Sequence, residues 1–382
     1  MKAYLFVFSF CLFTGNCLAE FEKKQLEHRF FCEGASVGDI NRDGHPDVIS
    51  GPYWYAGPSF ASRKEIYFPR PYPPASYSEN FLSWTGDINR DGWIDVLVVG
   101  FPGKAANWFE NPQGKEGHWK EHTAVDTVDN ESPNFSDMNG DGSPELIFSR
   151  GGAWMLASVN PDKPEEKWTV RALSGKATGG KFTHGLGYGD VNGDGRMDLL
   201  AKNGWWEQPA GTGKWTHHAF TFSPGGGAQM YAYDFDGDGD NDVLTSLAAH
   251  AYGLAWFENT GGKSFTPHII MSRKNEPGPL NLSFSQLHAI ELADMNGDGV
   301  KDIITGKRYW AHNGRDVGGN DPAVLYWLET RRGGTAGTCS FIPHKIDDDS
   351  GVGTQVAVAD MNGDGKPDVI VGNKKGTFVH LQ

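Results

Sequence analysis

The sequence predicts an all-β protein, a seven-bladed β-propeller with a calcium-type loop in each blade. Three observations lead to this fold class. A nine-residue acidic loop recurs seven times, short β-branched runs flank the copies, and aromatic motifs recur between them. The loops begin 44 to 66 residues apart, a period that suits a repeat architecture of four-stranded blades.

Each acidic loop has the composition of a site for a hard cation. Oxygen side chains occupy loop positions 1, 3, 5 and 9, and glycine at position 6 permits the sharp turn. Structural calcium ions that stabilise the turns are therefore expected, with weaker binding at the third loop, where Glu145 replaces aspartate. The expected ligands are Asp39, Asn41, Asp43, Asp47, Asp87, Asn89, Asp91, Asp95, Asp137, Asn139, Asp141, Glu145, Asp190, Asn192, Asp194, Asp198, Asp234, Asp236, Asp238, Asp242, Asp294, Asn296, Asp298, Asp302, Asp360, Asn362, Asp364 and Asp368.

The segments around each loop give the order of strands. β-Branched runs bounded by glycine, such as 96–99 and 369–371, read as strands. We place each loop between the innermost strand of a blade and the next strand. An aromatic pair such as Trp108 and Phe109 marks the third strand, and an aromatic residue three positions before a histidine marks the outer strand.

The ring is expected to close through its N-terminal strand. Too few residues follow Asp360 to complete a blade, and the segment 21–29, which carries His28, resembles an outer strand. Closure of this kind leaves no open sheet edge. Residues 20–382 are therefore predicted to form one propeller domain.

Residues 1–19 have the features of a secretory signal peptide. Lys2 precedes an apolar stretch at 3–13, and small residues at 17–19 suit cleavage. The protein is accordingly expected to be secreted or periplasmic, with no membrane span. After cleavage two cysteines remain, Cys32 and Cys339, which can form a disulfide or stay as buried thiols.

The net charge of −14 disfavours nucleic acid as a partner, because nucleic-acid binding needs a basic surface. Seven divalent ions in the acidic loops would carry an equal and opposite charge. Most of the acidity is thus explained by the loops. The sequence leaves the oligomeric state open.

The Asp-x-Asn-x-Asp-Gly-x-x-Asp loops resemble those of the FG-GAP and VCBS repeat families, which form propellers. This resemblance covers almost the whole chain after residue 19. It implies a fold and no particular function, since such propellers serve as adhesion modules and as enzymes. Functional residues must therefore be sought where the chain departs from the repeat.

Five of the thirteen histidines fit the repeat. They occupy the same place in outer strands, and recurrence at one structural position indicates a packing role. These are His28, His122, His218, His268 and His344.

Four other histidines, His184, His250, His288 and His312, do not fit it. His184 and His288 each lie six residues before a loop, at the start of an innermost strand, beside the central channel and opposite the loop. Glu131 shares that offset, and the connection carrying His250 returns to the same face. Neutral imidazoles converging with a carboxylate suit Zn²⁺ or a similar ion. The alternative is that each histidine makes an ordinary hydrogen bond in a channel wall.

The segments around these residues, including 278–281 before His288, resemble the propeller part of aldos-2-ulose dehydratase, a zinc-dependent carbohydrate enzyme. The chain has no room for that enzyme's additional domains. The resemblance implies a metal-dependent lyase or dehydratase that performs β-elimination on a keto-sugar or an oxidised glycoside. In this hypothesis zinc is held by His184, His250, His288 and Glu131, and His312 or Tyr309 is the base. Arg308 or Lys307 holds anionic charge, and Trp205, Trp310, Arg150 and Lys202 contact substrate.

Two other classes of function compete with the lyase hypothesis. A calcium-stabilised propeller that binds a glycan or a protein without catalysis would use the same face. A hydrolase would need paired carboxylates across a cleft, for which Glu33 and Glu131 are the candidates.

Overall fold

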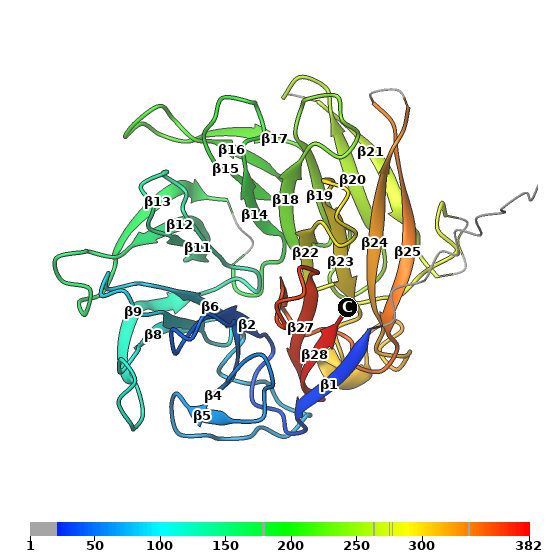
Figure 1. Cartoon of the computed structure of the whole chain (residues 1–382). Coiled ribbons are helices and arrows are strands. Elements are labelled where there is room, and N and C mark those ends of the chain that lie inside the picture. The colour runs from blue at the N-terminus through cyan, green and yellow to red at the C-terminus, as the bar shows by residue number, and fades with distance from the viewer. Residues whose placement is uncertain (1–20, 178–179, 263, 275, 277, 335–336) are drawn as a thin grey trace, which may run out of the picture.

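The computed structural model describes residues 21–177, 180–262, 264–274, 276, 278–334 and 337–382. Its sheets radiate from a central axis (Figure 1), which confirms the predicted all-β propeller. Strand pairing groups the strands into five four-stranded sheets and one eight-stranded sheet, so the expected seven separate sheets are not formed. The predicted signal peptide, 1–19, lies outside the described residues. No helix in the described ranges is long and apolar enough to cross a membrane.

The strands occur in four successive positions from the axis outward. The innermost strands are β2 (Ser36–Gly38), β6 (Leu82–Gly86), β10 (Asn134–Ser136), β14 (Leu186–Gly189), β18 (Gln229–Tyr233), β22 (Ile290–Ala293) and β26 (Val356–Ala359). The second strands are β3 (Asp47–Ser50), β7 (Asp95–Val99), β11 (Glu145–Arg150), β15 (Asp198–Ala201), β19 (Asp242–Ser246), β23 (Asp302–Gly306) and β27 (Asp368–Asn373).

The third and outer strands follow in the same order. The third strands are β4 (Tyr53–Tyr55), β8 (Lys104–Glu110), β12 (Ala153–Ser158), β16 (Gly204–Glu207), β20 (Leu254–Asn259), β24 (Leu325–Arg332) and β28 (Gly376–Leu381). The outer strands are β5 (Arg63–Glu65), β9 (Lys120–Val128), β13 (Thr169–Lys176), β17 (Thr216–Ala219), β21 (Phe265–Met271), β25 (Cys339–Asp347) and β1 (Glu22–Glu27). A short 3-10 helix, η1 (Ala311–Gly314), lies in the connection between β23 and β24.

The eight-stranded sheet arises because β14 pairs in parallel with β18. Glycines in β14 permit this close approach of two backbones. A Cβ atom at Gly187 would lie 1.9 Å from the Met230 carbonyl oxygen, and one at Gly189 would lie 2.4 Å from the Ala232 Cβ. The glycines of β14 therefore explain why two neighbouring four-stranded units share one hydrogen-bonded sheet.

The acidic loops connect the innermost and second strands, as the sequence predicts. Their last carboxylate also braces the sheet. Asp47 Oδ2 accepts a hydrogen bond from the Ile40 backbone, and Asp47 Oδ1 accepts one from Gly57, each at 2.9 Å. The same pair of backbone contacts recurs at Asp95, Asp198, Asp242, Asp302 and Asp368. Position 9 thus joins six of the seven loops to the end of the third strand, Glu145 being the exception.

The packing role expected for the outer-strand histidines is confirmed at four positions. His122 stacks on Trp108 with ring centroids 4.3 Å apart, and its Nε2 lies 2.8 Å from Glu110 Oε2. The same arrangement recurs at His218, His268 and His344. The prediction is wrong for His28, which is exposed one residue beyond β1 because that strand ends at Glu27.

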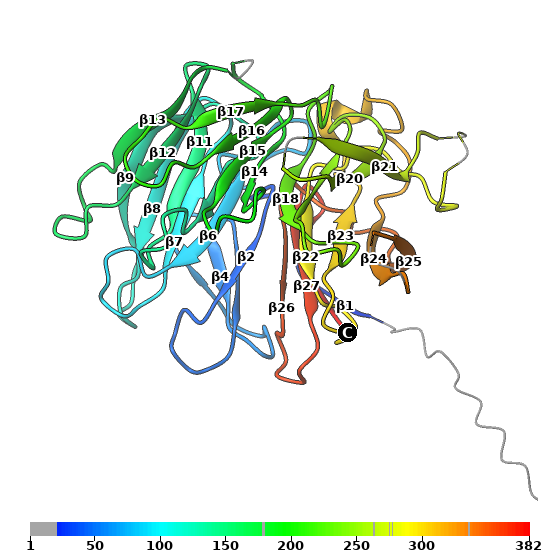
Figure 2. The same ribbon diagram turned by 90° about the horizontal axis from the view of Figure 1, so that it is seen from above.

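The two ends of the described chain meet in one sheet. β1 pairs antiparallel with β28, and the C-terminus lies beside β1 in both views (Figures 1 and 2). Glu27, at the end of β1, forms an ion pair of 2.6 Å with Arg63 of β5. Cys32 and Cys339 are free thiols, which excludes the disulfide alternative.

Candidate metal centre

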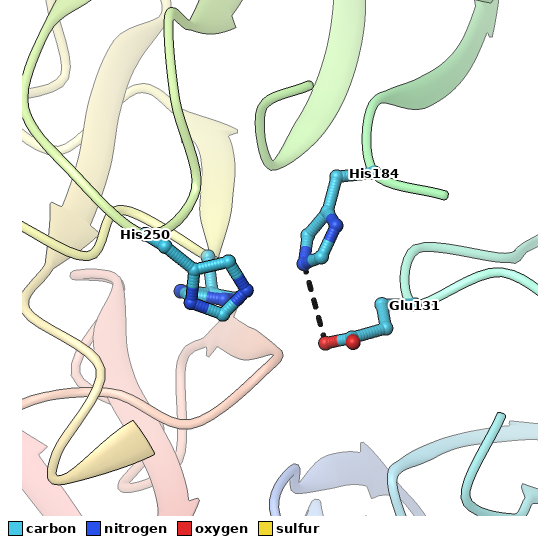
Figure 3. A group of neighbouring side chains, drawn as sticks. Glu131, His184 and His250 are labelled. Carbon is cyan, nitrogen blue, oxygen red and sulfur yellow. Dashed lines mark ion pairs between the residues drawn. The ribbon is translucent and has the colours of Figure 1, made fainter. Parts of the chain in front are cut away.

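One carboxylate and three imidazoles converge at the end of the propeller axis opposite the acidic loops. Glu131, His184 and His288 stand shortly before the innermost strands β10, β14 and β22, and His250 follows β19. One potential ligand atom from each residue lies within 4.8 Å of the others. Figure 3 shows Glu131, His184 and His250 pointing toward a common space. We call these four residues the axial cluster.

The distances within the axial cluster suit a shared ligand. His184 Nε2 lies 3.3 Å from Glu131 Oε2. The ring centroid of His250 is 4.9 Å from that of His184 and 4.5 Å from that of His288. These residues come from connections far apart in the sequence, so they do not form a short metal-binding sequence motif.

Hydrogen bonds on the far side of two rings determine their tautomers. His288 Nδ1 faces the Gln286 carbonyl oxygen at 3.3 Å, and His250 Nδ1 faces Asp316 Oδ2 at 3.1 Å. A carbonyl or an ionised carboxylate only accepts hydrogen bonds, so each Nδ1 must carry the proton. Each Nε2 is then left with a free lone pair, the arrangement usual for a metal-ligating histidine.

One imidazole has a buried nitrogen atom without a hydrogen-bond partner, and a second has only one contact. Nε2 of His288 is buried and unpartnered, whereas the buried Nε2 of His184 makes only the 3.3 Å ion-pair contact with Glu131 Oε2. An unsatisfied buried polar atom costs roughly 1–3 kcal/mol. A bound divalent ion would remove this cost, and the mixed nitrogen and oxygen donors are those preferred by Zn²⁺. The axial cluster therefore fits the expected metal.

The electrostatics of the axial cluster favour, at neutral pH, the protonation states that metal-binding side chains need, which are an ionised carboxylate and neutral imidazoles. Burial alone would raise the pKa of Glu131, but the adjacent His184 and Arg308 outweigh it and lower the pKa to about 2. Burial and the neighbouring His184 lower the pKa of His250 to about 4. Burial and the charge of Arg308 put the pKa of His288 well below its usual value. Glu131 is thus ionised, while His250 and His288 are neutral.

Arg308 has a structural role instead of the expected anion-binding role. Its side chain is 1% exposed, and its guanidinium lies 2.8 Å from Glu33 and 3.3 Å from Glu131. Lys307 is also buried and donates from Nζ to the Gly319 carbonyl at 2.9 Å. Both cations already have protein partners, so the structure does not support binding of substrate charge by either. Arg308 thus bridges Glu33 and Glu131, the two carboxylates considered for a hydrolase.

His312 lies at the exposed edge of the axial cluster. Its ring stacks on His250 at 4.5 Å, and its Nδ1 lies 3.0 Å from Asp316 Oδ2. The carboxylate therefore contacts both rings. His312 and two neighbours, Trp310 and Asn313, have left-handed backbone angles, a strained conformation often found at functional sites.

Asp316 is the residue that the sequence analysis missed. It follows His312 by four residues, in a connection without a repeat pattern. The backbone N–H of His312 also donates to the Tyr77 hydroxyl at 3.1 Å, so this segment is held on two sides. The four-residue spacing of His312 and Asp316 is the one sequence feature from which their contact could have been predicted.

The remaining predicted site residues are dispersed. Trp205 was expected to contact substrate, which is wrong, because its ring is 2% exposed and stacks on His218 in the core. The Tyr309 ring lies 4.9 Å from Lys375 Nζ, and Trp310 is half-buried beside Gly314. Arg150 ends β11 and Lys202 lies between β15 and β16, both half-buried.

The acidic loops contain a second kind of potential metal-binding group, made of carboxylates. In the fifth loop Asp234, Asp236 and Asp242 offer oxygens within 4.8 Å of one another. Burial, together with nearby Asp236 and Asp238, raises the pKa of Asp242 to about 7. A cation would relieve this crowding of carboxylates. Calcium occupancy of the loops stays a prediction.

Comparison with known families agrees with the repeat pattern. The FG-GAP-like repeat family matches residues 87–148, 137–201, 190–245 and 234–305, and the FG-GAP repeat family matches residues 352–379. These matches span more than half of the chain, which therefore belongs to the FG-GAP-like repeat family. The resemblance to aldos-2-ulose dehydratase stays a prediction.

Among the similar solved structures, the first below has a TM-score above 0.5 and agrees with the fold. BBS1N in complex with ARL6DN has a TM-score of 0.52 and 10% identity, covering 95% of this chain and 96% of that one. Rhamnogalacturonan lyase YesW has a TM-score of 0.46 and 13% identity, covering 94% and 72%. The Bacillus licheniformis rhamnogalacturonan lyase has a TM-score of 0.45 and 12% identity, again covering 94% and 72%. No curated protein matches the chain significantly.

Proposed function

We propose that the axial cluster binds one divalent transition ion, of the zinc type, and that the protein is a carbohydrate lyase acting by β-elimination. The observation that carries this proposal is the convergence of Glu131 with three imidazoles, among them His288, whose buried Nε2 atom has no hydrogen-bond partner. The sugar substrate, a keto-sugar or an oxidised glycoside, comes from the resemblance to the dehydratase. The ion would supply Lewis acidity, which acidifies a C–H bond beside a carbonyl group.

His312 is the base in this proposal. Asp316 accepts a hydrogen bond from His312 Nδ1, so His312 Nε2 is free to take a proton. The C–H proton passes to His312 Nε2, the electron pair of that bond forms a carbon–carbon double bond, and the β-oxygen substituent leaves with the proton that His312 returns to it. Asp316 is a positioning residue, because it fixes the tautomer of both His312 and His250.

The acidic loops complete the proposal as structural calcium sites. The two halves of the eight-stranded sheet then act as two blades of a seven-bladed ring, which β1 closes by pairing with β28. We further propose that residues 1–19 direct export, so that the protein works outside the cytoplasm.

A non-catalytic glycan- or protein-binding propeller is the second candidate. It is favoured by Arg308 Nη1, which lies 3.3 Å from the same Glu131 oxygen that approaches His184. A positive charge at this place competes with a metal ion for the carboxylate. In this second reading the axial cluster is only a polar network that stabilises the channel wall.

Metal content distinguishes the two candidates. Protein purified without added metal is compared with His184→Ala and His288→Ala, and with His118→Ala, an exposed surface control. We expect about one zinc per chain in the wild type and the control, with none in the two cluster variants. Calcium should be equal in all four proteins. A keto-sugar elimination assay, followed by enone absorbance, then tests the chemistry.

Calcium alone in every protein, unchanged by the substitutions, would contradict the lyase proposal and favour the binding propeller. Zinc retained by the His288→Ala variant would likewise contradict the proposal, because the ion would then be bound outside the axial cluster. Thermal unfolding of each variant shows that loss of metal is not loss of fold.

A further inference from the structure

A second site of interest is a cavity of about 530 Å³ beside the sheet β6–β9. Residues 66–81, the connection between β5 and β6, form one of its walls. Its lining includes Tyr67, Phe68, Asn80, Lys104, Asn107 and Phe109. The volume falls within the range of small-molecule sites, which is roughly 300–1,000 Å³. Phe109 belongs to the hydrophobic core and Tyr67 packs against it, but neither the core nor the axial cluster accounts for the exposed Phe68 ring.

Phe68 is the most exposed large apolar side chain described, at 76%. An isolated aromatic ring at the mouth of a cavity offers a flat face to a ligand. Deeper in the wall, Tyr67 stacks on Phe109 with ring centroids 4.7 Å apart. Phe68 follows Tyr67 of this stacked pair in the chain, and its own ring is uncovered.

Two amide oxygens in the lining lack donors. Asn80 is 3% exposed, and its Nδ2 donates to the Tyr67 hydroxyl at 3.0 Å, but its Oδ1 has no hydrogen-bond partner. Asn107 donates from Nδ2 to Glu121 at 2.6 Å, and its Oδ1 is also unpartnered. Both oxygens have almost no accessible surface, so a small rotation of each amide would be needed to present the oxygen to a hydroxyl donor in the cavity. A sugar ring supplies hydroxyl groups at its edge and an apolar C–H face for an aromatic ring.

The cavity is connected to the axial cluster by a short series of contacts. The backbone N–H of Glu33 donates to the Asn80 carbonyl at 2.9 Å, and the Glu33 carboxylate binds Arg308, which contacts Glu131. The same connection also carries Tyr77, whose hydroxyl accepts from the His312 backbone. One chain segment thus borders both the cavity and the proposed base.

We propose that this cavity is a subsite for a sugar ring of an oligosaccharide. This step deepens the proposed function, on which it rests for the reaction of another ring of the same oligosaccharide at the axial cluster. Phe68 stacks on the C–H face of the bound ring. Asn80 and Asn107 accept hydrogen bonds from its hydroxyl groups.

Calorimetric titration of the whole protein with cellotetraose, xylotetraose and tetragalacturonate tests the subsite. We expect at least one of these probes to bind, and Phe68→Ala to weaken that binding about tenfold. Asn107→Ala should weaken it by a similar factor. Ile269→Ala removes a 42% exposed side chain from β21 and serves as the matched control, with unchanged affinity.

Either of two results would overturn the proposed subsite. The first is that none of the three probes binds. The second is that the Phe68→Ala variant binds a probe as tightly as the Ile269→Ala variant does. Phe68 is exposed, so its loss does not threaten folding. Metal analysis of the same samples separates the two proposals, because failure of the metal centre leaves sugar binding intact, whereas failure of the subsite leaves the zinc in place.

Discussion

Glu27→Gln tests whether an ion pair at the chain ends stabilises the ring. Glu27 is 7% exposed and accepts charge-assisted contacts from Arg29 at 2.9 Å and Arg63 at 2.6 Å. Burial alone would raise its pKa, but the hydrogen bonds from Arg29 and Arg63 outweigh it and lower the pKa from 4.5 to about 2. The ionised form is therefore favoured by folding.

The magnitude follows from the size of that shift. A displacement from 4.5 to about 2 corresponds to about 3 kcal/mol at most. Both arginines are more than one-third exposed, so solvent screening reduces the expected contribution to about 1–2 kcal/mol. Because the folded pKa is depressed, this stability is fully present above pH 4.5 and is lost as the pH falls toward 2.

Urea unfolding at pH 7 and pH 3, followed by tryptophan fluorescence, measures the effect. We expect Glu27→Gln to lower the unfolding free energy by about 1–2 kcal/mol at pH 7, with more than half of that difference gone at pH 3. Glu22→Gln, on the same strand and 69% exposed in its side chain, is the matched control. A difference of equal size at both pH values, or a Glu27 variant as stable as the control at pH 7, would refute the reasoning.

Four further perturbations test other parts of the structure. Asp316→Asn should lower the elimination kcat by about 100-fold or more when zinc is saturating, because His312 loses the acceptor that fixes its tautomer. Zinc affinity should also fall, since Asp316 holds the tautomer of His250. An unchanged rate would exclude the pairing of His312 with Asp316. Gly187→Ala should lower the free energy of unfolding by about 3 kcal/mol, measured by thermal unfolding, since its Cβ would lie 1.9 Å from the Met230 carbonyl oxygen. The control variant Gly175→Ala, whose Cβ would meet nothing within 4 Å, should not destabilise the protein. Removal of calcium by a chelator should lower the unfolding free energy by about 3 kcal/mol per site, relative to a hundredfold excess of calcium over Kd. Asp238→Asn should reduce bound calcium by about one ion, and an unchanged calcium count would show that this loop is empty.

The sequence was most informative where the repeat itself carries the signal. The acidic loops fixed the positions of the innermost and second strands, because each loop must connect them. Departures from the repeat at a constant offset then identified Glu131, His184 and His288 as neighbours at one end of the axis. His250 follows the second strand of its blade, which returns to the same end of the axis, and its position there could be predicted from its distance to the loop.

Sequence reasoning failed where packing or irregular backbone decides the outcome. Trp205 belongs to an aromatic pair, and only its strand register opposite His218 shows that the ring is in the core. The ion pairs of Arg308 with Glu33 and Glu131 join segments more than 170 residues apart, and no local pattern predicts them. The parallel pairing of β14 with β18 depends on close backbone contact, which the glycines of β14 permit without specifying.

Diffraction data collected on both sides of the zinc absorption edge, from crystals grown without added metal, test the central claim most directly. The proposal predicts an anomalous peak at the axial cluster, within roughly 2.0–2.2 Å of Glu131 Oε2 and the Nε2 atoms of His184, His250 and His288. The same peak should be absent from crystals of His288→Ala. No peak at the cluster, with Arg308 still bound to Glu131 and a water molecule between the imidazoles, would contradict the metal centre and with it the proposed lyase.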